Sequence, residues 1–318
     1  MPPHAHPASG GQIDFLPMPA APHPRVGWAF TCRRGGFSHG PWGGAQDAPG
    51  LNLGTHCGDD PGAVACNRTL LAQAIGQPIR WLNQVHGTRV FHADQAAPAA
   101  SPPTPPPGTA APTATDPAAP DTHTLQAQAS HLAPEADAQI TTKPGQAQAV
   151  MVADGLPVLL ADRQGRVVGA THAGWRGLAA GVIEATVAQM RQTLASHGQT
   201  AGVAIPPPAP AARSACPEDD LVAWLGPCIG PDAFEVGDEV REAFLQHAPQ
   251  AADAFTPGRA AGKWLANLPL LAQQRLTALG ITGIHTADAC TFSQPARFYS
   301  YRRTPTCGRM AALVWLRD

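Results

Sequence analysis

The hydrophobic and polar positions along the chain predict an interleaved set of strands and helices. Continuous apolar runs predict buried strands at 149–160, 167–170, 221–225 and 311–316. Apolar residues that recur at helical spacing predict helices at 61–75, 178–195, 240–247 and 268–279. These elements follow no regular strand–helix–strand repeat, and the chain contains neither a GxGxxG fingerprint nor a P-loop. The pattern therefore argues against a dinucleotide-binding or P-loop fold.

Local signals mark where some of these elements begin and end. Asp60 precedes Pro61, which suits a helix N-cap followed by the first helical position. Gly76 suits the C-cap of the same helix. A strand predicted over 80–91, with an embedded glycine turn, places His86 near a strand end.

Composition changes the picture where proline and alanine replace bulky apolar residues. Residues 96–134 and 199–218 have too few large apolar side chains to offset the entropy of ordering, which predicts low-complexity insertions. The same argument predicts a flexible N-terminal tail over 1–24. We expect the rest, within 25–318, to form a single catalytic-type domain that is long enough to bury a large core.

Charge and cysteine usage restrict the possible partners. Charged residues make up 14 % of the chain and the net charge is −2, so we expect no broad basic surface for nucleic acid. No apolar run approaches the ~20 residues that span a bilayer, and the opening residues lack the pattern of a signal peptide. The seven cysteines show no zinc-ribbon spacing, and we expect reduced thiols in a cytoplasmic protein. The oligomeric state stays open.

The densest candidate chemistry lies at 171–177, directly after an apolar run. His172 supplies an imidazole for metal or proton chemistry, and Arg176 supplies a planar cationic fork for phosphate or carboxylate. Glycines between a strand and a helix let the backbone approach a ligand, and N–H groups at a helix start favour an anion. His86, in a Gln-Val-His-Gly stretch, is a second imidazole. Together these residues predict a functional site.

These stretches belong to an ordered set that runs from about residue 26 to the C-terminus. The set comprises residues 34–36, 52–60, 67–68, 84–87, 136–138, 153–162, 172–177, 226–230, 235–237, 290–292, 298–303 and 308–310. On these motifs the chain resembles the bacterial laccase-domain proteins, a multicopper-polyphenol-oxidase-like family. Its members are described as purine nucleoside phosphorylases and as a peptidoglycan editing factor.

The resemblance implies an α/β (α+β) sandwich in a single domain, with mixed β-sheets flanked by helices. It also implies a zinc site made of His86, His172 and a cysteine that follows Ala-Asp. In this chain the cysteine position is Gly155, which offers no side-chain ligand. The third ligand would then be water, substrate or a substitute thiol, and the candidate thiols are Cys57, Cys228 and Cys290. Copper ranks below zinc because the sequence has no His-Cys-His cluster of the blue-copper kind.

The implied reaction is phosphorolysis of purine nucleosides to the free base and ribose 1-phosphate, with adenosine, inosine, guanosine and methylthioadenosine as substrates. Adenosine deamination is a further implied activity. The expected catalytic residues are His86, His172 and Arg176, and the expected substrate contacts are Arg34, Asn52, Arg68 and Phe298. Two alternatives stay open. The first is a binding or regulatory member of the family whose catalysis is impaired because of Gly155. The second is an enzyme that edits a peptidoglycan precursor.

Overall fold

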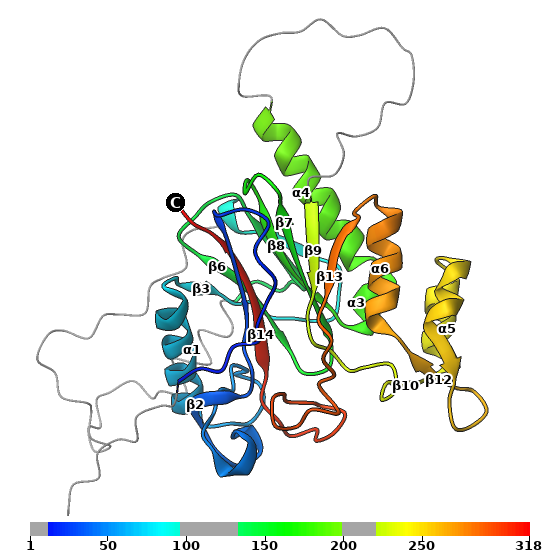
Figure 1. Cartoon of the computed structure of the whole chain (residues 1–318), viewed down its shortest axis with the longest axis horizontal. Helices are drawn as coiled ribbons and strands as arrows, with labels where there is room; N and C mark the ends of the chain where they lie inside the picture. Colours follow the sequence, from blue (N-terminus) through cyan, green and yellow to red (C-terminus); the bar gives the residue numbers. More distant parts are fainter. Residues whose placement is uncertain (1–11, 96–132, 199–220) are drawn as a thin grey trace, which may run out of the picture.

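The computed structural model in Figure 1 describes residues 12–95, 133–198 and 221–318. Its largest sheet has the strand order β13 (Gly283–Thr286), β9 (Leu221–Leu225), β7 (Leu156–Asp162), β8 (Val168–Ala173), β5 (Ala138–Thr141) and β4 (Val90–His92). A four-stranded sheet has the order β1 (Val26–Phe30), β14 (Met310–Leu316), β6 (Ala147–Val152) and β3 (Ile79–Arg80). A small sheet has the order β10 (Glu235–Gly237), β12 (Lys263–Ala266) and β11 (Phe255–Pro257). Parallel and antiparallel pairs occur together, so the sheets are mixed as expected.

The two larger sheets pack against each other, and helices cover their outer faces (Figure 1). Side chains from both sheets share one core, among them Phe30, Val150, Leu159, Trp224 and Val314. The outer face of the larger sheet carries α3 (Trp175–Ala180), α4 (Val182–Gly198) and α6 (Leu268–Ala278), with α5 (Asp238–Leu245) in the same core. The outer face of the four-stranded sheet carries α1 (Pro61–Ile75). The α/β sandwich with helices on the sheets is therefore confirmed.

Strand β7 explains why a continuous apolar run forms a strand here. Val158 and Leu160 point into the core beneath the helices, whereas Leu159 and Ala161 point into the core between the sheets. Successive side chains of a strand face opposite sides, so a strand covered on both faces needs apolar residues at every position. All residues of β7 are buried.

The predicted helix boundaries at α1 are confirmed by its capping contacts. The Asp60 carboxylate accepts the backbone N–H of Ala63 at 2.9 Å, and Gly76 ends the helix with a φ of 67°. A left-handed residue at this position costs least when it is glycine. The helices predicted at 240–247 and 268–279 are also confirmed, as α5 and α6.

Three predicted elements are divided in the structure. The apolar run at 149–160 forms two strands, β6 and β7, because the chain turns at 153–155 between the two larger sheets. The helix predicted at 178–195 is interrupted at Gly181, whose φ of 98° ends α3 before α4 begins. The strand predicted over 80–91 is wrong in its middle: only its ends form strands, β3 and β4, and they join different sheets.

The N-terminal prediction needs a correction for the part that the structure describes. Ile13 is buried in the core beneath α1, and the N–H of Leu16 donates to the carbonyl of Phe30 at 2.9 Å. Residues 12–24 therefore pack on the domain, because a few apolar side chains in this stretch reach its core. Residues 1–11 and almost all of the predicted insertions at 96–134 and 199–218 lie outside the described residues.

Helix length and polarity bear on membrane association. In the ranges described above, no helix is both long and apolar enough to cross a bilayer.

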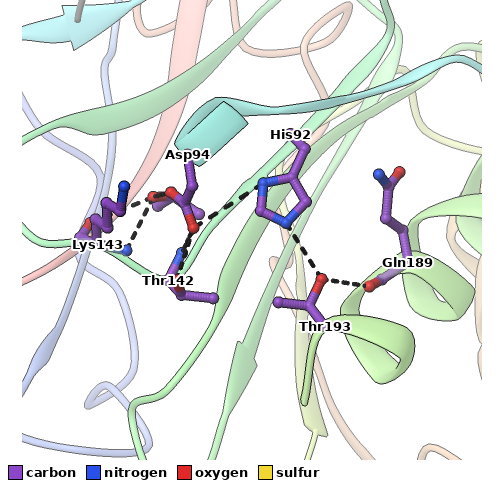
Figure 2. A network of polar contacts seen from close by, with 7 residues as sticks. His92, Asp94, Thr142, Lys143, Gln189 and Thr193 are labelled. Carbon is purple, nitrogen blue, oxygen red and sulfur yellow. Dashed lines mark hydrogen bonds and ion pairs between the residues drawn. The ribbon is translucent and has the colours of Figure 1, made fainter. Parts of the chain in front are cut away.

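A largely buried polar network joins the end of β4 to β5 and α4, as Figure 2 shows. Asp94 follows β4 and accepts hydrogen bonds from the Thr141 hydroxyl at 2.5 Å, the Thr142 N–H at 2.9 Å and the Thr142 hydroxyl at 2.6 Å. His92 lies between Asp94, with Nδ1 at 4.0 Å from its carboxylate, and the Thr193 hydroxyl on α4, with Nε2 at 3.3 Å. Burial alone would raise the pKa of Asp94, but the bonds from Thr141 and Thr142 outweigh it and hold that pKa below its usual range.

We expect Asp94→Ala to destabilise the domain by about 1.5–3 kcal/mol, because it leaves buried hydroxyl and N–H donors without a charged acceptor. The difference from the parent should be present above pH ~4, the pKa of an aspartate in the unfolded chain, and should shrink as the pH falls through the lower pKa of the folded state. Urea unfolding at a series of pH values measures it.

Asp94→Asn is the matched control, since it keeps an acceptor oxygen of the same shape without the charge. Its loss of stability should be smaller than that of the alanine variant. A loss that stayed constant between pH 7 and pH 2 would contradict the ionised role of Asp94.

Candidate active site

A cavity of about 490 Å³ lies where the turn between β6 and β7 meets the end of β8 and the C-terminal loops. Its lining residues are His56, Gln84, His86, Met151, Ala153, Asp154, Gly155, His172, Gly174, Trp175, Arg176, Ile229, Phe234, Leu268, Tyr301, Arg302 and Arg309. The three residues expected to be catalytic, His86, His172 and Arg176, therefore lie in one cavity.

The two histidines reach the cavity from different elements. His172 lies on β8 and is 4 % exposed, whereas His86 lies in the segment between β3 and β4 with a φ of 61°. The two imidazole centroids are 4.9 Å apart, and the ring planes are inclined at 79°. A left-handed φ is uncommon for a side chain with a Cβ, so strong local hydrogen bonds are expected to hold His86.

Asp137 supplies those bonds. Its buried carboxylate accepts the backbone N–H groups of Val85 at 3.1 Å, His86 at 2.9 Å and Gly87 at 2.7 Å. The same carboxylate lies 3.0 Å from Nδ1 of His172. Burial would raise the pKa of Asp137, but the bonds from His172 and the backbone of Gly87 and Val85 lower it.

The ionised state of Asp137 determines the orientation of the His172 ring. An ionised carboxylate only accepts hydrogen bonds, so Nδ1 of His172 carries the proton and Nε2 is left for the cavity. Burial and the neighbouring His172 lower the pKa of His86, so the His86 ring is neutral near pH 7.

Gly155 lies against the free edge of His172. A Cβ built on Gly155 would lie 2.6 Å from Nε2 of His172, a separation that real Cβ atoms essentially never show. The imidazole thus occupies the space that a larger residue at position 155 would need. A cysteine there requires the ring to move, so the absent thiolate and the position of His172 are coupled.

The residues present do not fit the three-ligand zinc site that the resemblance implies. Within the described part of the chain, no group of three or more His, Cys, Asp or Glu residues is arranged to hold a metal ion. The candidate substitute thiols, Cys57, Cys228 and Cys290, are absent from the cavity lining.

Positive charge dominates the rest of the lining. Arg176 is exposed and stacks 4.5 Å from the ring centre of Trp175, while Arg302 and Arg309 approach from the C-terminal loops. The one acidic residue among the described lining residues, Asp154, has its carboxylate engaged by other groups. The cavity therefore favours an anionic ligand.

Asp154 ties the C-terminal loops to the cavity. Its φ is 85°, and its carboxylate accepts the Thr291 hydroxyl at 2.6 Å, the Ser300 hydroxyl at 3.0 Å and the Arg302 N–H at 2.7 Å. These bonds place Tyr301 and Arg302 at the cavity. With its carboxylate engaged by three donors, Asp154 acts as a structural residue of the cavity wall.

The expected substrate contacts lie elsewhere and need correction. Phe298 is fully buried and packs against Phe30 at 6.2 Å between ring centres, so it has no surface for a substrate. Asn52 is also fully buried, and its side chain joins Gly54, Asp59 and Arg309.

The two expected arginine contacts also lie outside the lining. Arg34 lies on β2 (Arg34–Ser38). Arg68 on α1 donates to the carbonyl of Leu53 at 2.9 Å and stacks on Trp81. Neither arginine therefore contributes to the lining of the cavity.

Several lining residues were missed by sequence reasoning. His56, Tyr301 and Arg309 lie within stretches that carry the family resemblance, and this is the signal that could have found them. Gln84 exchanges two hydrogen bonds with the backbone of Met151, at 2.7 and 2.9 Å, and so fixes the wall beside the histidines. No spacing rule connects these residues, because they come from four separate segments.

The family described as multi-copper polyphenol oxidoreductase laccase matches residues 27–212 and 209–317. A protein of Pseudomonas aeruginosa named purine nucleoside phosphorylase is 40 % identical over 302 residues, which cover 95 % of this chain and 96 % of that protein. The purine nucleoside phosphorylase YfiH of Escherichia coli is 38 % identical over 307 residues, 96 % of this chain and 100 % of that protein. A crystal structure of a Neisseria meningitidis protein superposes with a TM-score of 0.71 at 36 % identity, over 96 % of this chain and 100 % of that chain.

In the presence of a metal chelator, we expect Gly155→Ala and Gly155→Cys each to have a lower melting temperature than the parent. Each variant adds a Cβ in the space that the His172 ring occupies. Overpacking of this kind typically costs about 1–3 kcal/mol. Zinc should raise the melting temperature of the cysteine variant, in which a thiolate joins the two imidazoles, more than that of the parent. Thermal unfolding with chelator or zinc, together with measured metal content, tests this expectation.

The alanine variant separates the two effects, since it adds the Cβ without the thiolate. If zinc shifted the parent and both variants equally, position 155 would have no part in metal binding.

Proposed function

This chain belongs to the multi-copper polyphenol oxidoreductase laccase family, and from that premise we propose that it is a purine nucleoside phosphorylase. In this proposal it cleaves the glycosidic bond of adenosine, inosine, guanosine or methylthioadenosine with inorganic phosphate and releases the base and a ribose 1-phosphate. The names of relatives that match nearly the whole chain support the activity. The observation that carries the proposal here is a cavity with an oriented imidazole beside three arginines.

The arginines provide what phosphate requires. A phosphate dianion needs charged donors that hold it close to the anomeric carbon, and guanidinium groups form strong charge-assisted bonds to its oxygens. Arg176 is the first candidate because it is exposed in the cavity and its described contact is the Trp175 ring. Arg302 and Arg309, which come from the C-terminal loops, add further positive charge to the cavity.

His172 is the candidate for proton transfer at the leaving base. Cleavage of the glycosidic bond builds negative charge on the purine, which a proton or a hydrogen bond stabilises. Asp137 holds the ring so that Nε2 faces the cavity. In this proposal His172 acts in its imidazolium form beside the Asp137 carboxylate: as the glycosidic bond breaks, Nε2 gives its proton to the purine and Nδ1 keeps its own. No step depends on a metal, because the donor set here does not fit one.

Tyr301 is the candidate surface for the purine ring. It is 54 % exposed, an unusual state for a large aromatic side chain, and it lines the cavity. The Arg309 guanidinium lies 5.7 Å from its ring centre. Aromatic rings stack on one another with offset or edge geometry, so the free face of Tyr301 suits a flat base.

A second candidate function is nucleoside binding without turnover. Gly155 favours it, because a site that lacks one expected ligand keeps its positive charge but loses part of its chemistry. Adenosine deamination is a further proposed activity of the same cavity.

We expect the parent to release hypoxanthine from inosine only when phosphate is present. Arg176→Met should raise the KM for phosphate by about 10- to 100-fold, since a hydrogen bond to a charged group is worth about 1.5–3 kcal/mol. Steady-state kinetics with varied phosphate measures the change.

Arg241→Met is the matched control, because Arg241 also stacks on a tryptophan, at 4.2 Å from the ring centre of Trp264, but lies outside the lining. Its kinetics should equal those of the parent. If the parent binds inosine but releases no base with phosphate, the binding function replaces the phosphorylase proposal.

We expect Tyr301→Ala to raise the KM for inosine by about 2- to 10-fold, which corresponds to the roughly 0.5–1.5 kcal/mol of an aromatic pair. The KM for phosphate should stay unchanged. Tyr301→Phe keeps the ring and should behave as the parent. An equal loss in both variants would assign the effect to the hydroxyl and contradict the stacking role.

A further inference from the structure

Two cysteines lie side by side behind the cavity wall. Cys228 and Cys290 are partners in an isolated parallel β-bridge, and Cys228 is 2 % exposed whereas Cys290 is partly exposed. Neighbouring strands lie about 4.7–4.9 Å apart. This separation falls within the range of about 4.4–6.8 Å between the Cα atoms of disulfide-linked residues.

The two thiols have opposite surroundings. The sulfur of Cys290 accepts the backbone N–H groups of Gly230 at 3.1 Å and of Ser293 at 3.4 Å. Burial would raise the pKa of Cys290, but the bonds from Ser293 and Gly230 outweigh it and lower that pKa. Burial raises the pKa of Cys228 far above its usual range. The N–H donors therefore favour the thiolate form of Cys290, whereas Cys228 beside it is a buried neutral thiol.

We propose that Cys290 is a modification site that reacts with hydroperoxides and then forms a disulfide with Cys228. The Cys290 thiolate attacks one oxygen of the peroxide, the O–O bond breaks, and hydroxide or alkoxide leaves. The sulfur is oxidised by two electrons to a sulfenic acid, and the peroxide is reduced. The Cys228 sulfur then attacks the Cys290 sulfur and forms the S–S bond, and the sulfenic oxygen leaves as water with the thiol proton of Cys228.

The bridge lies against the residues that shape the cavity. The N–H of Thr291 donates to the carbonyl of Cys228 at 2.9 Å, and the Thr291 hydroxyl donates to Asp154 at 2.6 Å. The N–H of Ile229, a lining residue, donates to the carbonyl of Asp154 at 3.0 Å. A disulfide at this position therefore acts directly on the support of the cavity, whatever ligand the cavity binds.

Cys66 offers an internal comparison. It is more exposed than Cys290, and no hydrogen-bond donor to its sulfur is found among the described residues. If access alone governs reactivity, Cys66 reacts first. If stabilisation of the thiolate by N–H donors governs it, Cys290 reacts first.

The test uses the full-length reduced protein, treated with hydrogen peroxide at pH 7 in the presence of dimedone and analysed by peptide mass spectrometry. We expect Cys290 to be modified about tenfold faster than Cys66 and, without dimedone, a Cys228–Cys290 disulfide to form. Cys228→Ser should accumulate the dimedone adduct at Cys290, and Cys290→Ser should form no such disulfide. Alkylation of the parent by iodoacetamide between pH 5 and pH 9 gives the same comparison without any buried substitution.

Equal or faster modification of Cys66 would overturn the assignment of Cys290 as the reactive thiol. Modification of Cys290 without any disulfide to Cys228 would overturn the pairing. Both readouts follow the thiols themselves, so they are independent of nucleoside phosphorolysis.

Discussion

The candidate site depends on one buried carboxylate. Asp137 lies just before β5 and collects the N–H groups of 85–87 and the imidazole of His172, which belong to segments far apart in the sequence. A second link, from the N–H of His172 to the carbonyl of Asp137 at 2.7 Å, belongs to the pairing of β5 with β8. The strained backbone of His86 and the orientation of His172 both follow from this single charge.

Gly155 has a structural consequence as well as a chemical one. Its missing side chain removes a ligand, and the space is taken by the His172 ring, held by Asp137. At position 155 the wall of the cavity is therefore closely packed, with the His172 imidazole against the backbone of Gly155. The positive charge of the cavity comes from its arginines and is therefore independent of position 155.

A second carboxylate organises the other wall. Asp154 adjoins Gly155, and its carboxylate holds the segments around Thr291 and Arg302. Cys290 precedes Thr291, and its partner Cys228 precedes Ile229, whose N–H donates to the Asp154 carbonyl. The histidines, the phosphate-binding arginines of the proposal and the reactive thiol are thus connected through a few residues at the turn between the two sheets. A change at the cysteine pair is therefore expected to affect the cavity, because the same residues hold both.

The sequence by itself determined the local features of this protein. Apolar runs predicted β9 and β14, and the Asp60–Pro61 and Gly76 signals predicted α1, since strand burial and helix capping depend on neighbours in the chain. The motifs also identified His86, His172 and Gly155. Only the tertiary structure decided that Phe298 and Asn52 are buried, that Tyr301 is exposed in the cavity, and that Asp137 joins the two histidines. These outcomes depend on contacts between strands of different sheets and between loops that are far apart in the sequence. The spacing of apolar residues along the chain does not predict which residues such contacts leave accessible.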